Sequence, residues 1–295
     1  MKIIFFSEFS RKIGSGHYIR SQRLYNELKN KHETQYFLNK NKVFINNFLK
    51  KNKKKCIYIF DLKKYEKFHN SKKNFYIYFD NKIYMGKNSI NINPLFPDHK
   101  NYNGPKWHVF PKDFDIKKVF RKITKKRKIL ICQGGTDPHN NIPKLIRIVK
   151  NKIKDLEFEL HVLINNKLLI SNKLKKKYLL HEHKNIKKLS KFLKEYDHII
   201  TGCGNICLEI NYLGIPSTYV SSEKREIKLA KYFKKKGFGN FFKVTDSKKI
   251  REHLHKQLKI SKDGKINIMK KKIKYFRHDG LKNINKLIDK LKYEI

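Results

Sequence analysis

The stretch Ile13-Gly14-Ser15-Gly16-His17-Tyr18-Ile19-Arg20 decides how the fold begins, because it joins an apolar run to a segment of helical periodicity. Residues 1–6 carry the nearly continuous apolar run of a strand that is buried on both faces. Ile19, Leu24 and Leu28 follow at roughly helical spacing. Strand, glycine turn and helix in this order predict the first βα unit of a parallel sheet.

His17 falls in or near the first turn of that predicted helix, at the carboxyl edge of the sheet. The partial positive charge of a helix N-terminus disfavours an imidazolium, so we expect a mostly neutral ring at pH 7 that can act as a base. The alternative is a tight turn capped by a surface histidine. Taken alone, a glycine pair with one histidine favours this alternative, because the pattern is common.

The alternation of strand and helix continues along the first part of the chain. Runs typical of strands occur at residues 34–38, 56–60 and 75–79, and they predict a doubly wound α/β sheet. Asp61 and Asp80 each close one of these strands. An aspartate in this position can face a ligand at the carboxyl edge of the sheet, although it more often caps the following turn.

A change in amino-acid composition marks the predicted boundary between two domains. Proline and glycine punctuate residues 91–114, and a highly basic segment follows. We therefore expect an N-terminal Rossmann-like domain at residues 1–118 and a C-terminal one at residues 119–279. The last helix, within residues 280–295, carries an apolar side that we expect to pack back on the first domain.

Two further glycine turns follow strands in the second domain. One is Gly134-Gly135-Thr136-Asp137-Pro138, and the other is Gly202-Cys203-Gly204-Asn205. Backbone N–H groups in such turns can cradle a phosphate, although a tight connection without a ligand is an equal alternative. Glu209, in the helix after the second turn, can bind sugar hydroxyls or simply complement the helix dipole at the surface.

The charge of the chain indicates an anionic partner. Lys and Arg number 71 against 25 Asp and Glu, for a net charge of +46. Nucleic acid, an acidic membrane surface and a nucleotide-linked substrate all fit this balance. The basic residues are mostly lysines spread along the whole chain, which argues against a specific nucleic-acid site. Weak association with an acidic inner membrane surface remains an alternative.

Cysteine usage and hydropathy predict a reduced, cytoplasmic protein. The four cysteines form no CxxC pair, and no apolar run approaches transmembrane or signal length. We expect no metal and no cofactor, and a monomer is the favoured oligomeric state. His181-Glu182-His183 resembles a metal-binding corner but lacks the i, i+4 spacing of a helical site, so a solvated loop is the prediction there.

Taken together, the glycine turns and their neighbours resemble the UDP-sugar hydrolases of pseudaminic acid biosynthesis (PseG) and their spore-coat polysaccharide relatives (SpsG-like proteins). Both are similar to MurG-type glycosyltransferases. The matching pieces run in the family's order, and they are Ile13 to Arg20; Asn103 to Trp107 with Phe110 to Phe114; Gly134 to Pro138; and Gly202 to Glu209 with Leu213 to Pro216.

The resemblance implies a GT-B architecture, in which two Rossmann-like domains face each other across a cleft and UDP lies mainly on the second. It also implies that His17 is the base that activates water at the anomeric carbon and that Glu209 binds the ribose hydroxyls. The other substrate-binding residues that it implies are Gly14, Gly16, Arg20, Gly134, Gly135, Thr136, Gly202, Gly204 and Asn205.

The chain departs from the family pattern in three places. Phe6 and Glu8 stand where the first strand usually ends in Arg-x-Asp, and Glu223-Lys224-Arg225 replaces a common Glu-Asn-Gln. The stretch after Asp80 also lacks the paired Asp that often follows that strand. The nucleotide half of the resemblance is therefore better supported than the identity of the sugar.

Three functions follow from the sequence. The leading prediction is hydrolysis of a UDP-activated deoxy amino sugar in surface-glycan synthesis. The alternative is a GT-B glycosyltransferase that passes the sugar from a UDP donor to a glycan or lipid-linked acceptor. The third, from a different class, is a non-enzymatic protein that binds polyanions through charge alone, for which aromatic residues interleaved with arginine would be expected.

Overall fold

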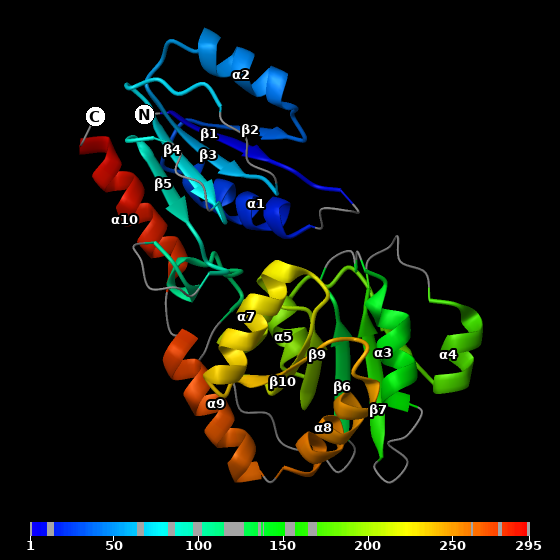
Figure 1. Ribbon diagram of the computed structural model, residues 1–295. Helices are drawn as coiled ribbons and strands as arrows, with labels where there is room; N and C mark the ends of the chain where they lie inside the picture. The colour runs from blue at the N-terminus through cyan, green and yellow to red at the C-terminus, as the bar shows by residue number, and fades with distance from the viewer. Residues whose placement is uncertain are drawn as a thin grey trace. The chain divides into compact units, whose positions relative to one another are not determined.

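A computed structural model describes residues 2–10, 15–63, 68–81, 86–96, 102–114, 127–134, 137, 139–150, 157–164, 170–260, 262–276 and 279–293. Figure 1 shows the chain with its helices and strands labelled. Contacts divide the chain into two compact units, one of residues 1–110 with 278–295 and the other of residues 111–277. The predicted junction at residues 118 and 119 falls in a segment outside the described residues.

The first unit is an α/β sheet with helices on both faces. Its elements are β1 (Lys2–Ser7), α1 (Gly16–Leu28), β2 (Thr34–Leu38), α2 (Lys42–Lys51), β3 (Cys56–Asp61), β4 (Phe75–Phe79), β5 (Ser89–Ile92), the short helix η1 (Pro105–Trp107) and α10 (Gly280–Tyr293). Among the described residues, the sheet has five strands in the order β2-β1-β3-β4-β5, and all of its pairs are parallel.

Strand β1 shows why both faces of this sheet are covered. Ile3 and Phe5 pack in a cluster with α1 and α10, whereas Ile4 and Phe6 pack in a second cluster with α2. Figure 1 shows α1 and α10 on one side of the sheet and α2 on the other. The run Ile3–Phe6 is therefore apolar without alternation, because successive side chains enter different cores.

Helix α10 closes the first core from the far end of the chain. Its residues Ile284, Leu287, Ile288 and Leu291 lie in the same cluster as Ile3 and Phe5. Its first residue, Gly280, lies against the backbone of His108, so close that a Cβ atom would collide with the His108 carbonyl. The helix can dock there only because residue 280 has no side chain.

The second unit is a larger sheet of the same class. Its elements are β6 (Arg127–Cys132), α3 (Asn141–Lys150), β7 (Phe158–Leu163), α4 (Asn172–Tyr178), β8 (His181–His183), α5 (Leu189–Leu193), β9 (His198–Thr201), α6 (Asn205–Tyr212), β10 (Ser217–Val220), α7 (Lys224–Lys235), β11 (Gly239–Phe242), α8 (Ser247–Lys259) and α9 (Lys262–Phe276).

The described strands of the second sheet follow the order β11-β10-β9-β6-β7-β8, again all parallel. Counted from β6, this is the strand order 6-5-4-1-2-3 of a dinucleotide-binding Rossmann fold, read from the other edge. One core joins β6 and β7 to α3 and α8. In the described part of the chain, no helix is long and apolar enough to span a membrane.

The expected solvated loop at His181-Glu182-His183 is wrong. These residues form β8, which pairs in parallel with β7 at the edge of the second sheet. Their local composition is polar, but a short edge strand needs only one partner strand, because water can hydrogen-bond the N–H and C=O groups of its outer side. The pairing with β7 therefore overrides the local preference for a loop.

Candidate functional site

In each unit, those predicted site residues that the structure describes lie where the direction of winding reverses. In a doubly wound sheet, the connections after two neighbouring strands leave toward opposite faces at one point, and ligands bind at the carboxyl ends there. In the first sheet this point lies between β1 and β3, and in the second it lies between β6 and β9. We call these the first and the second switch point.

At the first switch point, the histidine that follows β1 meets the aspartate that ends β3. His17 lies in the first turn of α1, and its Nδ1 is 2.7 Å from Oδ1 of Asp61. The His17 side chain is only 13% exposed, so it does not cap the helix at the surface. The residues are 44 positions apart, and the parallel pairing of β1 with β3 brings them together.

Arg20 joins the same carboxylate from one helical turn further on. Its guanidinium donates to Asp61 through Nε at 2.8 Å and through Nη2 at 2.5 Å, and to Asp80 through Nη1 at 2.7 Å. It also lies over the ring of Phe79, 4.7 Å from the ring centre. Ser21 adds a hydrogen bond to Asp61 at 3.2 Å. The two aspartates at the strand ends therefore do more than cap the following turns, because both bind the buried Arg20.

The electrostatics of this cluster keep Asp61 ionised. Burial by itself raises the pKa of Asp61, but the charge of Arg20 and hydrogen bonds from Arg20 and His17 outweigh it and lower the pKa to about 2. Burial also opposes the charge of Arg20, and the two carboxylates more than offset that effect and raise the arginine pKa. The buried charges are therefore paired on both sides.

An ionised Asp61 also decides the tautomer of His17. A carboxylate can only accept hydrogen bonds, so Nδ1 of His17 carries the proton that lies between the two side chains. In the neutral ring this leaves the lone pair on Nε2. The arrangement is that of a general base whose orientation is set by a carboxylate.

At the second switch point, the turn after β6 begins with Gly134, which has φ of +78°. Asp137 accepts hydrogen bonds from the backbone N–H groups of Asn141 and Ile142 at 2.9 Å each. It therefore caps α3. Gly135 and Thr136 lie outside the described residues, as does Gly14 of the first unit.

The turn after β9 is lined by side chains from two other elements. The Gln133 amide is assigned so that its nitrogen donates to the carbonyl of Val220 at 3.1 Å and its oxygen accepts from the N–H of Gly202 at 3.2 Å. From α7, Oε2 of Glu226 accepts from the N–H of Cys203 at 3.3 Å. The Cys203 N–H also donates to Oγ of Ser221 at 3.0 Å, so side chains hold the N–H groups of both Gly202 and Cys203.

Glu226 lies close to both glycines of the turn. A Cβ atom on Gly202 would be 3.3 Å from its carboxylate, and one on Gly204 would be 3.2 Å away. Burial raises the pKa of Glu226, against hydrogen bonds from Ser221 and the Cys203 N–H that lower it. No motif of the sequence includes this residue. The departing triplet at residues 223–225 was the available signal, because Glu226 comes directly after it.

Glu209 is buried in α6 and does not sit at the surface as a simple partner of the helix dipole. Burial chiefly raises the pKa of Cys132 to about 12, and the nearby carboxylates of Glu209 and Asp137 add to this rise. Glu209 therefore lies near the carboxyl end of β6. Gly204 precedes α6 and Asn205 begins it, so the predicted residues of this turn share one helix start.

Sequence comparison reaches only part of the chain. No family model matches it. A stretch of 126 residues is 31% identical to the uncharacterized protein MJ1062 of Methanocaldococcus jannaschii, and the match covers 39% of this chain and 26% of that protein. The chain thus spans about a quarter of the length of this curated relative.

Structure comparison covers almost the whole chain. The spinosyn rhamnosyltransferase SpnG, complexed with thymidine diphosphate, has a TM-score of 0.67 at 11% identity over 97% of this chain and 100% of its own. MurG of Acinetobacter baumannii has a TM-score of 0.65 at 13% identity, over 98% of this chain and 99% of its own. A putative UDP-N-acetylglucosamine 2-epimerase of Listeria monocytogenes has a TM-score of 0.67 at 9% identity, over 100% of this chain and 97% of its own. At such identities the likeness is one of fold, and the chain has the GT-B fold, with two parallel-sheet α/β domains.

Proposed function

We propose that this protein is a glycosyltransferase that uses a nucleoside diphosphate sugar as donor and a hydroxyl group as acceptor. The observation that carries the proposal is the His17–Asp61 pair, with 2.7 Å between Nδ1 and Oδ1, at the first switch point. Transferases that bind thymidine diphosphate or belong to the MurG type are among the proteins of similar fold, and they favour transfer over the hydrolysis that the sequence favoured.

In the proposed reaction, Nε2 of His17 takes the proton of the acceptor hydroxyl as its oxygen attacks the anomeric carbon. The bond between that carbon and the diphosphate oxygen breaks, and the nucleoside diphosphate leaves with the bonding electrons. Asp61 stabilises the imidazolium that forms and keeps Nδ1 as the donor. Arg20 acts as a positioning residue, because its guanidinium is occupied by Asp61 and Asp80 and is 1% exposed.

The departing nucleotide belongs to the second switch point in this proposal. The N-terminus of α6, which follows the Gly202–Gly204 turn directly, stabilises the charge of the diphosphate. The assignment of the Gly134-Gly135 turn to the same diphosphate rests on the family resemblance. The assignment of the ribose hydroxyls to Glu209 rests on the family resemblance, and its burial near the end of β6 is compatible with a role beneath the nucleotide.

Hydrolysis is the second candidate, with water in place of the acceptor hydroxyl. It is favoured by the order of the sequence motifs, from Ile13–Arg20 to Leu213–Pro216, which resembles UDP-sugar hydrolases of pseudaminic acid synthesis. The His17–Asp61 pair serves either acceptor, because water and a sugar hydroxyl both lose one proton as they attack.

The test is release of nucleoside diphosphate from a panel of UDP- and TDP-sugars, measured with and without a panel of glycan and lipid-linked acceptors. Release that requires an acceptor supports transfer, and release in buffer alone supports hydrolysis. Either activity should collapse in His17→Ala and persist in His69→Ala, which changes an exposed histidine of the same unit. Absence of both release and nucleotide binding contradicts the proposal, and salt-sensitive RNA binding that UDP fails to compete would then favour the polyanion-binding alternative.

A further inference from the structure

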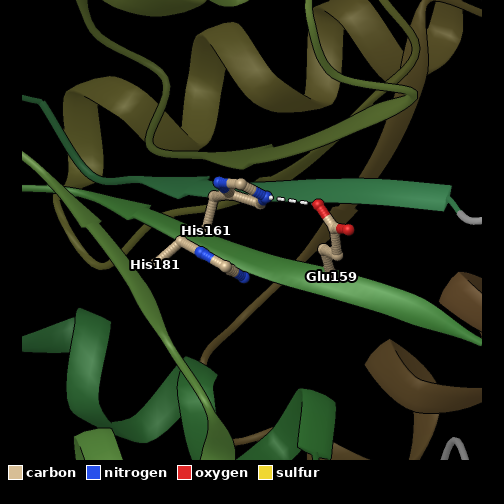
Figure 2. A group of neighbouring side chains, drawn as sticks. All are labelled: Glu159, His161 and His181. Atoms are coloured by element: carbon tan, nitrogen blue, oxygen red, sulfur yellow. Dashed lines mark hydrogen bonds and ion pairs between the residues drawn. The ribbon is translucent and has the colours of Figure 1, made fainter.

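A second group of titratable side chains lies outside both switch points, on strands β7 and β8. Glu159, His161 and His181 each offer one ligand atom, and these atoms all lie within 4.8 Å of one another. Figure 2 shows the three side chains gathered above the two strands, with Glu159 and His161 joined. The proposed reaction uses none of them.

The register of the sheet explains why these residues meet. Glu159 and His161 are two positions apart on β7, so they share a face, and His161 is paired directly with His181 of β8. The two imidazoles stack with 4.5 Å between their ring centres. Glu182 lies between the histidines of β8 and points to the other face, where Lys175 and Lys184 neutralise it.

We propose that Glu159, His161 and His181 bind a divalent transition-metal ion, with Zn²⁺ as the leading candidate. Two imidazoles and one carboxylate form a ligand set that Zn²⁺ prefers, and water completes the coordination. Nε2 of His161 is 3.2 Å from Oε2 of Glu159. Ligand atoms about 2.0–2.1 Å from a tetrahedral ion are separated by roughly 3.4 Å, so this pair is already close to the required spacing.

His183 supports the site from the side away from the ion. Its Nε2 is 2.9 Å from Nδ1 of His161. When Nδ1 of His161 donates this hydrogen bond, Nε2 of His161 is left deprotonated and able to coordinate the metal. Histidine ligands commonly have such an outer partner, which fixes both the tautomer and the ring orientation.

Access and competing charge determine the strength of this site. His181 is exposed, so its ring can turn toward an ion that arrives from solvent, whereas His161 is buried and held. Lys128 lies 3.8 Å from Oε2 of Glu159 and competes with the ion for that carboxylate. A bound ion would tie the three-residue edge strand β8 to β7, a structural role independent of the proposed transfer reaction.

The experiment is a Zn²⁺ titration of chelator-treated protein that carries no histidine tag. Calorimetry measures the affinity and the number of bound ions, and thermal unfolding with and without Zn²⁺ measures the stabilisation. We expect one Zn²⁺ per chain and a higher unfolding temperature with the ion. His181→Ala should weaken binding at least tenfold, and Glu159→Gln should weaken it in the same direction. These two positions are chosen because neither side chain is fully buried, so both variants should fold.

His69→Ala, which removes an exposed histidine from the first unit, serves as the matched control and should bind Zn²⁺ as the wild type does. Co²⁺ in place of Zn²⁺ should give the visible absorption of a four-coordinate site, and His181→Ala should lose it. Equal Zn²⁺ affinity in the wild type and His181→Ala overturns the proposal. So does the absence of binding in wild-type protein that circular dichroism shows to be folded.

Discussion

The two switch points share one type of topology and differ in the groups that line them. The first is built from charged side chains, with Asp61 and Asp80 holding Arg20 and His17 in a buried network. The second is built around backbone N–H groups of glycine turns and helix starts, with the Glu226 carboxylate beside them. A side-chain network can move a proton, whereas a cradle of N–H groups can only stabilise an anion.

The strongest test of this contrast is Asp61→Asn. The substitution leaves Arg20 buried with only Asp80 as a charged partner among the described contacts, and breaking a buried pair in this way costs about 3–5 kcal/mol. Urea unfolding at pH 7 should show this loss. Ser21→Ala, which removes a neutral hydrogen bond to the same carboxylate, should cost only about 1 kcal/mol. Equal effects of the two variants would mean that the ion pairs contribute little.

The second unit buries an ionisable amine, and alkaline pH should reveal its effect on stability. Lys272 in α9 donates to the Ile215 carbonyl at 2.6 Å and to Ser217 Oγ at 2.9 Å. Burial lowers the pKa of this lysine from 10.5 to about 7. The unfolded chain therefore binds more protons between pH 7 and pH 10.5, and the free energy of unfolding should rise across that range by up to about 1.4 kcal/mol per pH unit.

Urea unfolding of the wild type and Lys272→Met between pH 7 and pH 9.5 isolates this contribution. The variant should lose the slope whatever its stability at pH 7, because the lost hydrogen bonds do not depend on pH. A wild type and a variant with parallel pH profiles would show that Lys272 titrates in the folded chain as it does in the unfolded one.

The first switch point should be sensitive to acid. The pKa of Asp61 falls from 3.8 in the unfolded chain to about 2 in the folded protein, so its contribution is complete above about pH 4 and disappears as pH falls toward 2. This shift corresponds to about 2 kcal/mol. Acid unfolding followed by circular dichroism should show the loss in the wild type, while Asp61→Asn should lack this part of the acid dependence.

The smallest expected effect concerns the second switch point. Glu226 accepts a hydrogen bond from Cys203 in the turn beside the proposed diphosphate site, so its negative charge opposes the nucleotide. Glu226→Gln should therefore tighten UDP binding several-fold, about 1 kcal/mol. Because burial raises the pKa of Glu226, wild-type affinity should weaken as pH rises and the carboxylate ionises, and the variant should lack this trend. Weaker UDP binding by the variant would mean that the carboxylate contacts the ligand directly.

The elements that the sequence predicted best are those that local pattern determines. The run at residues 34–38 became the half-buried edge strand β2, and the runs at 56–60 and 75–79 became the buried strands β3 and β4, because each has the composition of a strand. Strand β11 was not predicted, since its Gly239 and Asn240 are poor strand formers. Pairing with β10 makes it a strand.

The site was predicted in part for the same reason. His17 and the glycine turns follow strands directly, so their placement at the carboxyl edge depends only on a few neighbouring residues. The partners of His17 and Arg20 could not be foreseen, because Asp61 lies 44 positions from His17 and Asp80 lies 60 positions from Arg20. Glu226 and the histidines of β7 and β8 likewise meet their neighbours only through the order of the strands.

By itself, the sequence determined the class of fold, the alternation of strand and helix, and the positions of the turns, because periodicity and glycine act over a few residues. Only the tertiary structure decided which strand lies beside which. That order brings Asp61 to His17 and His181 to His161. Charges and hydrogen bonds act over a few ångströms in space, whatever the separation of their residues along the chain.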